Sequence, residues 1–431
     1  MNVLVFNDPG FTRKEKILYL TILLFFLTFY LPTMPVINNI CIALIFVYCF
    51  FFNSTRDKLM LLKERKAIWF MLLLYLLHLV SAFFSVNKQE AVTLLGIRIP
   101  LLMFPLSLGL VYIREELKDQ ILLLYARVTA AAALLCLVSA IRVALRMKET
   151  AFLYNDSLCE LIGKQSIYFA LLVNLAIFCY SYLLVKKTKV SIARGMAYLA
   201  LFFLFIINFL LASRIAIANL YLSLFVFALY YIIKRKKYLE GAALVIGLFL
   251  GAFILLKTFP KTINRFRELG YTEYKFNGQG MESHYNMALT AGQWNGANIR
   301  LAVWTCGWEL ARQYPVFGAG LGDKKGKMMD IYREKHFDFA LKTERNMHNN
   351  YLDLLCAFGV FGLLLFLVAY FLLPAIGCYR SHDYLGLFIL GAFAFSLSSE
   401  TYLDRSIGCV LLTFFSGLIA AFNKPKTDSS V

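Results

Sequence analysis

The 431-residue chain is poor in charge, has no CxxC pair, and lacks both a DxD motif and any His/Asp/Glu cluster at metal-ligand spacing. Only 16% of its residues are charged, whereas 60% are apolar and the mean hydropathy is +0.67. A water-soluble globule cannot bury so much apolar side chain, so most of it must face lipid. The same composition excludes a disordered chain, a collagen-like chain and a small disulfide-stabilised domain. The nine cysteines are scattered, mostly in apolar runs, and are interpreted as small core residues.

Twelve apolar segments approach the roughly 20 residues that a helix needs to cross a bilayer. They are residues 17–34, 36–52, 67–84, 91–113, 121–145, 167–185, 193–212, 215–233, 241–256, 350–376, 384–398 and 406–422. No A-x-A-like cleavage site follows the first segment, so we interpret it as a retained span and not a signal peptide. The sequence therefore predicts an all-α polytopic membrane protein with about 12 transmembrane helices.

The distribution of Lys and Arg predicts the orientation, because short basic segments are held on the cytoplasmic side. With the N-terminus inside, the inner segments hold 21 Lys and Arg and the short outer segments hold six. Both termini are therefore expected in the cytoplasm. This predicts an N-terminal bundle of about nine helices (1–257), a periplasmic loop domain (258–347), C-terminal membrane helices (348–422) and a cytoplasmic tail (423–431). Because the excess charge forms no single basic face, we expect no nucleic-acid partner.

The long hydrophilic stretch 258–347 carries 13 Lys and Arg and nine acidic residues. Within it, residues 299–314 place apolar side chains at helical spacing, which predicts an amphipathic helix against the membrane surface. These side chains are Leu301, Trp304, Trp308 and Leu310. A glycine-rich turn follows at 315–323 and a second helix is expected at 327–341. The turn lacks the preceding strand and the following Lys-Ser/Thr of a phosphate-binding loop, so we interpret it as a turn.

His348 stands where the hydrophilic stretch meets the tenth apolar segment. An imidazole at this boundary is the side chain best suited to proton abstraction near neutral pH. The alternative is a structural role at the helix start, where Asn349 and Asn350 would satisfy free backbone amides.

Three arginines have unusual surroundings. Arg214 lies between two apolar runs with almost no loop, so its guanidinium either snorkels to the outer interface or meets an anion. Arg300 begins the predicted amphipathic helix and is either solvated or turned toward an outer-facing cavity. Arg98 is the most anomalous charge by membrane depth, and is either functional or paired internally. Glu400, predicted at the outer face, is a candidate partner.

Guanidinium forks match phosphate oxygens, and several converging forks suit a diphosphate. If Arg98, Arg214 and Arg300 reach one outer-facing cavity, they would stabilise a departing diphosphate without a metal ion. We therefore expect neither a metal nor another cofactor.

Three stretches resemble the O-antigen ligase and Wzy-type polysaccharide polymerase superfamily of bacterial inner membranes. They are ASRIAIANL (212–220), NIRLAVWTCGWELARQYPVFGAGLGD (298–323) and MHNNYLDLLCAFGVFGLLLFL (347–367). Together with the many spans and the large outer loop, the resemblance extends over roughly residues 200–376. It separates ligases from polymerases poorly.

The resemblance implies an outer-face glycosyltransferase that takes a glycan from undecaprenyl diphosphate. The acceptor is a lipid A-core sugar in ligases, the next lipid-linked repeat in polymerases, and a protein Ser or Thr in the related O-linking oligosaccharyltransferases. It implies diphosphate binding by Arg214 and Arg300 and acceptor activation by His348, whereas Arg98 is added on membrane depth alone. We expect an O-antigen ligase in the inner membrane, acting as a monomer on a lipid-linked donor and lipid A-core or another glycan acceptor.

The competing class is a lipid-linked oligosaccharide flippase or another transporter, which would also need many spans and buried arginines. Transporters usually place polar groups near the membrane midplane and often show paired repeats. Here the polar residues gather in one outer loop and no repeat is detected, which favours an enzyme.

Overall fold

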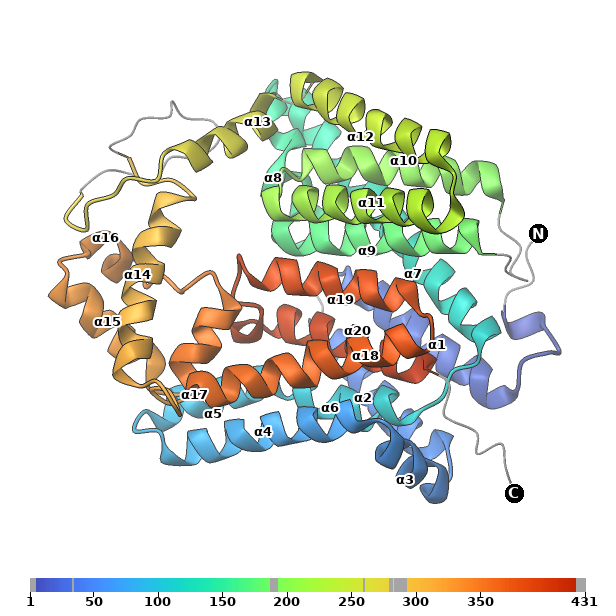
Figure 1. Ribbon diagram of the computed structural model, residues 1–431, viewed down its shortest axis with the longest axis horizontal. Coiled ribbons are helices and arrows are strands. Elements are labelled where there is room, and N and C mark those ends of the chain that lie inside the picture. Colours follow the sequence, from blue (N-terminus) through green and yellow to red (C-terminus); the bar gives the residue numbers. More distant parts are fainter. Residues whose placement is uncertain are drawn as a thin grey trace.

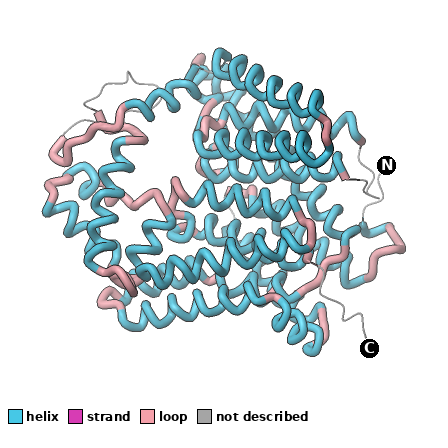
Figure 2. The backbone as a smooth tube through the Cα atoms, in the orientation of Figure 1, coloured by secondary structure: helices cyan, strands magenta, loops and turns pink. Residues whose placement is uncertain are grey.

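The computed structural model describes residues 5–32, 35–186, 193–258, 260–278, 282 and 293–423, and every regular element within these ranges is helical (Figure 2). The longer helices of the first half are α1 (Arg13–Phe29), α2 (Pro35–Phe52), α3 (Thr55–Glu64), α4 (Lys66–Phe84), α5 (Lys88–Arg98), α6 (Pro100–Leu106), α7 (Glu115–Met147), α9 (Ser166–Val185), α10 (Arg194–Leu210), α11 (Arg214–Arg235) and α12 (Tyr238–Thr258). The second half contains α13 (Pro260–Arg267), α14 (Asn298–Gln313), α15 (Lys324–Glu334), α16 (Asp338–Lys342), α17 (Asn350–Leu367), α18 (Leu373–Arg380), α19 (Tyr384–Leu397) and α20 (Ser406–Phe422). Short turns α8 (Asn155–Leu158) and η7 (Tyr402–Asp404) lie between them.

Among the described residues, five helices are long and apolar enough to cross a membrane: Lys66–Phe84, Lys88–Leu110, Glu115–Met147, Ser166–Val185 and Asn350–Arg380. A sixth candidate is the pair Val36–Phe52 and Thr55–Glu64, which is bent by 103°. Five shorter apolar helices complete the set: Arg194–Leu210, Arg214–Tyr230, Tyr238–Ile254, Tyr384–Leu397 and Ser406–Phe422. The all-helical architecture is confirmed for the described residues, while the number of 12 membrane crossings stays a prediction.

The helices run side by side in one bundle, with α9 to α12 along one side, α4 and α17 along the other, and α19 between them (Figure 1). Residues far apart in sequence share its core. Phe25 of α1 stacks on Phe414 of α20 with ring centroids 4.6 Å apart, and Tyr125 of α7 packs edge-on against Phe415 at 5.2 Å. The first and last helices therefore belong to one apolar core.

The start of the described chain and its end lie at the same end of this bundle. Arg114, just before α7, pairs with Glu15 in the first turn of α1, and the neighbouring Ile113 amide donates to the Ala421 carbonyl at 2.9 Å. Helices α13 to α16 lie at the opposite end (Figure 1). The predicted domain boundaries and the cytoplasmic and periplasmic sidedness stay predictions. Residues 424–431 of the expected tail lie outside the described residues.

The hydrophilic stretch folds into helices, but its details differ from expectation. The predicted amphipathic helix is present as α14, and of its predicted apolar residues Leu310 is buried as expected. Ile299, Ala302, Val303 and Cys306 join it in a core shared with α15, α16 and the start of α17. Of the residues expected to form its apolar face, Trp308 is 55% exposed, because this helix packs on protein along another side. The predicted helix 327–341 is two helices, α15 and α16, separated by a turn at His336, whose φ is +52°.

The glycine-rich segment 315–323 is a turn, as predicted, and it docks on α17 where that helix is interrupted. The Val360 amide donates to the Pro315 carbonyl at 2.8 Å, and the Ala319 amide donates to the Cys356 carbonyl at 2.7 Å. Gly318 (φ +73°) and Gly359 (φ +66°) face these contacts, where a Cβ would lie 2.2–2.3 Å from opposing backbone atoms. This close approach requires glycine and fixes the loop domain to α17.

Candidate active site

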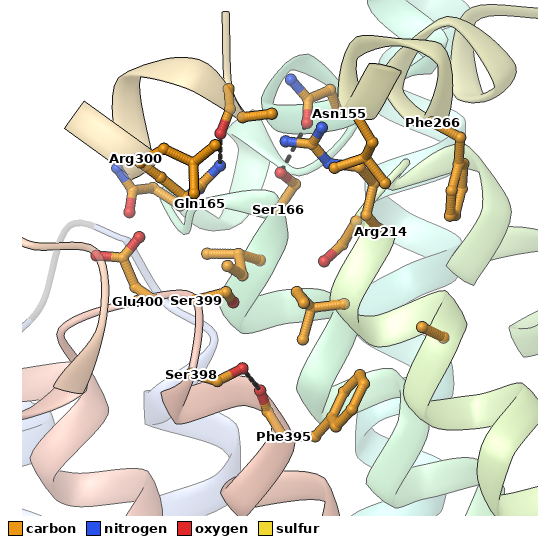
Figure 3. A pocket seen from close by; sticks show the side chains of 18 of the residues that line it. Asn155, Gln165, Ser166, Arg214, Phe266, Arg300, Phe395, Ser398, Ser399 and Glu400 are labelled. Carbon is orange, nitrogen blue, oxygen red and sulfur yellow. Dashed lines mark hydrogen bonds between the residues drawn. The ribbon is translucent and has the colours of Figure 1, made fainter. Parts of the chain in front are cut away.

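A cavity of about 560 Å³ lies where α9, α11, α14 and the end of α19 meet (Figure 3). Its polar side chains gather near α8 and α14, and apolar side chains from α9, α11 and α19 line the part that faces the bundle. The lining residues include Arg214, Arg300, Trp304, Ser398, Ser399 and Glu400, and among the apolar ones Ile167, Ile215, Ala218 and Phe395. The cavity therefore combines a cationic polar end with an apolar end.

Arg214 enters the cavity because it is the first residue of α11. The turn before it is tight, with Ala212 at φ +50°, and the Ser213 side chain caps the helix by accepting from the Ala216 amide. The Arg214 side chain is 12% exposed, and its Nη1 lies 3.5 Å from Glu268 Oε2. The arginine expected to snorkel or meet an anion thus lines a cavity and pairs there with a carboxylate.

Arg300 approaches the same point from α14, and its Nη1 donates to the Gly296 carbonyl at 2.6 Å. A Cβ on Gly296 would lie 2.6 Å from Arg214 Nη2 and 3.4 Å from Arg300 Nη1. The sum of these distances, about 6 Å, is an upper bound on the separation of the two nitrogens, a spacing that two phosphate groups can bridge. The structure brings together two of the three arginines that the sequence singled out, as Figure 3 shows.

His348 is paired with Glu400, a contact that joins the start of α17 to the segment after α19. His348 Nδ1 lies 3.0 Å from Glu400 Oε2. An ionised carboxylate only accepts hydrogen bonds, so Nδ1 carries the hydrogen and Nε2 is left as the basic nitrogen. His348 also has a φ of +44°, a backbone conformation rarely adopted by residues other than glycine and asparagine.

Glu400 links this pair to the cavity, since Glu400 lines the cavity whereas His348 lies beside it with 22% of its side chain exposed. Burial alone would raise the pKa of the Glu400 carboxyl. The hydrogen bond from His348 and the charges of His348, Arg405 and Arg300 outweigh burial and hold this pKa below its usual value. Glu400 therefore stays ionised near neutral pH and can orient the imidazole.

The residues around His348 hold its backbone in place. The Asn349 side chain caps α17 by accepting from the Tyr351 and Leu352 amides, as the structural alternative expected. The Asn350 side chain, also expected to cap the helix, instead accepts from the Leu403 amide. The Trp304 indole Nε1 donates to the Met347 carbonyl at 2.8 Å, so α14 anchors the residue that precedes His348.

Arg98 does not line the cavity, which corrects the expectation that it helps to bind the diphosphate there. Its side chain is fully buried, and it pairs with Asp404 at 2.7 Å, with Asp353 at 3.6 Å, and with the Leu403 carbonyl at 3.0 Å. The suggested partner Glu400 instead pairs with His348. Internal pairing, the alternative left open by the sequence, is the one that the structure shows for Arg98.

Several residues of the site were not found from sequence. Glu268 gave no signal in the sequence because it is one of nine acidic residues in a long hydrophilic stretch. Gly296 gave no signal because it matters only through the two arginine side chains that face it in the fold. Asn155 and Gln165 line the cavity from a segment with no recognised motif. Asp353, in contrast, had a usable signal, since an acid inside an apolar span is expected to be paired or functional.

No group of three or more His, Cys, Asp and Glu side chains in the described part of the chain is placed to hold a metal ion. His284 lies outside the described residues. The candidate site is thus built from two guanidinium groups, a carboxylate-bound imidazole and an apolar extension, a combination suited to binding an anionic lipid and activating a hydroxyl group.

The long apolar helices around this cavity define a multi-pass helical membrane protein. Residues 199–367 match the sequence model of the family described as O-antigen ligase. This match supports membership of the chain in the O-antigen ligase and Wzy-type superfamily, and with it a ligase or polymerase type of function on a glycan or lipid-linked substrate. No curated protein matches the chain in sequence. The matched segment contains Arg214, Arg300 and His348.

Proposed function

We propose that the protein is an O-antigen ligase of the bacterial inner membrane. It transfers a polysaccharide from undecaprenyl diphosphate to a sugar hydroxyl of lipid A-core at the periplasmic face, without a metal ion. The observation that carries this proposal is the convergence of Arg214 and Arg300 on Gly296 within one cavity that Glu400, the partner of His348, also lines.

The reaction is a single displacement at the anomeric carbon of the donor sugar. The acceptor hydroxyl oxygen forms the new glycosidic bond while the bond from the anomeric carbon to the diphosphate oxygen breaks. His348 Nε2 takes the hydroxyl proton, and Glu400 stabilises the imidazolium that forms. Arg214 and Arg300 stabilise the negative charge that develops on the departing undecaprenyl diphosphate. Attack opposite the leaving group inverts the configuration at the anomeric carbon.

The distribution of polar and apolar side chains in the cavity supports this placement of the donor. The guanidinium groups lie at its polar end near α14, where the diphosphate would bind. Ile167, Ile215, Ala218 and Phe395 line the end between the helices, where the first isoprene units of the lipid would lie.

The proposal is tested with purified enzyme in lipid nanodiscs, a lipid-linked glycan donor and lipid A-core. The decisive variant is His348→Asn, because asparagine tolerates the left-handed backbone at this position and removes only the base. Loss of general-base catalysis is expected to lower the transfer rate by roughly 10²- to 10⁴-fold. Binding of undecaprenyl diphosphate should stay unchanged, since Arg214 and Arg300 are intact. Normal transfer by this variant would remove His348 from the chemistry.

The same assay separates the related functions. An O-antigen ligase extends lipid A-core with a preformed polymer, whereas a polymerase lengthens the lipid-linked glycan when no lipid A-core is present. An O-linking oligosaccharyltransferase would glycosylate a protein acceptor. A flippase would move the donor across the bilayer and form no glycosidic bond.

A further inference from the structure

Four charged side chains form a buried cluster outside the cavity. Lys324 Nζ lies 2.6 Å from Asp353 Oδ1 and 2.9 Å from Asp404 Oδ1. Arg98 Nη2 lies 2.7 Å from Asp404 Oδ1 and 3.6 Å from Asp353 Oδ2. Two positive and two negative charges are thus interleaved, so each charge is compensated inside a low-dielectric region. The cluster unites α5, α15, α17 and η7.

Arg98 is the member with the most contacts. Besides Asp404, its Nε donates to the Leu403 carbonyl at 3.0 Å, and its Nη1 lies 2.8 Å from His78 Nε2. Because a guanidinium only donates, His78 Nε2 accepts, and His78 Nδ1 donates to the Leu74 carbonyl at 2.7 Å. Arg98 therefore connects α4 with the backbone and the side chain of η7 through a planar fork, which a lysine ammonium lacks.

The cluster is connected to the His348–Glu400 pair through the chain segments that carry both. Asp404 and Leu403 belong to the same short segment, 400–405, as Glu400. Asp353 is in the first turns of α17, which begins two residues after His348. The segment and the helix are also joined directly, because the Leu403 amide donates to Asn350 Oδ1 at 3.0 Å. The segment 400–405 and the start of α17, which carry Glu400 and follow His348, are therefore held together by the cluster and by this hydrogen bond.

We infer that the buried cluster of Arg98, Lys324, Asp353 and Asp404 holds the His348–Glu400 pair in register for the transfer proposed above, on which this inference rests. Arg98 is accordingly a positioning residue, which acts through η7 on Glu400 and touches no substrate. The cluster also fixes the loop domain relative to this pair, because Lys324 is the first residue of α15. Burial opposes ionisation of Asp404, but the charges of Lys324 and Arg98 hold its pKa well below the usual range, so Asp404 remains ionised at neutral pH.

The test is Arg98→Lys, which keeps the charge but cannot reproduce the planar set of contacts to Leu403, His78 and Asp404. Small misplacements of catalytic groups are costly, so kcat should fall by roughly 10- to 100-fold. The donor KM should stay within about twofold, because Arg214 and Arg300 are untouched. Hydrogen exchange of the peptide covering 400–405 should become faster, whereas exchange in α9 should be unchanged.

A double-mutant cycle distinguishes positioning from a general loss of stability. If Arg98 acts through Glu400, Arg98→Lys should cost about twofold or less in a Glu400→Gln background, because the pair is already broken. The matched control is Lys118→Met. Lys118 is buried and lies 3.3 Å from Asp383, and this pair is at the end of the bundle away from the cavity. Lys118→Met should lower the unfolding midpoint while leaving kcat at the wild-type value.

Each result supports or overturns the inference. A wild-type kcat for Arg98→Lys, or an equal loss of kcat with and without Glu400→Gln, overturns it even if the transferase proposal stands. If wild-type protein forms no glycosidic bond, the transferase proposal fails. The exchange measurement then still tests whether the cluster holds the segment 400–405 in place. Unchanged exchange at 400–405 in Arg98→Lys would show that the cluster does not hold the segment.

Discussion

Gly296→Ala offers a sharp test of the proposed diphosphate site, because the change adds one methyl group between the two cavity arginines. Gly296 does not have a positive φ, so alanine fits its backbone. The new Cβ would lie 2.6 Å from Arg214 Nη2, 3.3 Å from Glu268 Oε2 and 3.4 Å from Arg300 Nη1. Only the first of these distances is so short that the contacting atom must move.

The size of the effect follows from these distances. A carbon–nitrogen contact is comfortable near about 3.5 Å, so Arg214 Nη2 must retreat by about 0.9 Å. The guanidinium is the end of a flexible side chain and can move without unfolding the protein. A shift of this size in a positioning group costs up to about 100-fold in rate. We therefore expect kcat/KM for the donor to fall by roughly 10- to 100-fold, or about 1.4 to 2.7 kcal/mol of transition-state stabilisation.

The assay is steady-state transfer at varied donor concentration, combined with thermal unfolding and with undecaprenyl diphosphate as a competitive inhibitor. Gly270→Ala is the matched control, since Gly270 lies in the same stretch and a Cβ there meets nothing within 4 Å. The control should behave as the wild type in all three measurements. Gly296→Ala should keep its unfolding midpoint but bind the inhibitor more weakly. Unchanged kcat/KM and unchanged inhibition in folded Gly296→Ala would refute the assignment of this point as the diphosphate site.

Three further predictions follow from the same geometry. Arg214→Lys should raise the donor KM by about 10-fold or more, because an ammonium cannot form two parallel bonds to phosphate oxygens; titration with undecaprenyl diphosphate checks this, and wild-type affinity would contradict it. Trp304→Phe removes the hydrogen bond to the Met347 carbonyl and should lower kcat several-fold, since such a bond is worth about 1 kcal/mol, while donor affinity is retained. The pKa of Glu400 is below 4.5 in the folded protein because of His348 and the nearby arginines, so its stabilising contribution is complete above pH 4.5 and is lost as pH falls through the lower folded-state value. The difference in unfolding midpoint between wild type and Glu400→Gln should therefore shrink as pH falls below 4.5, and a difference that does not depend on pH would count against the ionised pair.

Metal removal provides an independent test of the proposed chemistry. Transfer should proceed at the same rate after exhaustive treatment with EDTA, because two guanidinium groups supply the positive charge that a divalent ion would otherwise provide. An absolute requirement for added Mg²⁺ or Mn²⁺, measured at saturating donor, would contradict the metal-free displacement.

Much of the helical architecture was predictable because its signal is local. Runs of apolar residues placed α4 and α9 to within one residue, since any helix in lipid must satisfy its own backbone. The predicted segment 121–145 starts six residues after α7 does, and 350–376 runs nine residues past the end of α17. Helix α14 was predicted from the helical spacing of its apolar residues. Its orientation was not, because Leu301 and Trp304 line a cavity that other parts of the chain create, while Ala302 and Cys306 face the core.

The site was predictable only in part, and the arginines show why. Arg98 and Arg214 had equivalent signals in the sequence, each a guanidinium among apolar residues, yet one closes a buried ion cluster and the other lines a cavity. Acids distant in the chain decide where each arginine lies. Asp353 and Asp404 are more than 250 positions from Arg98 and form the buried cluster with it and Lys324. Arg214 instead pairs with Glu268 at 3.5 Å beside the cavity. Membrane depth shows that a charge needs a partner. Whether that partner comes from the protein or from a bound anion depends on contacts across the fold, which is why Arg98→Lys and Arg214→Lys should fail differently, the first in kcat and the second in donor affinity.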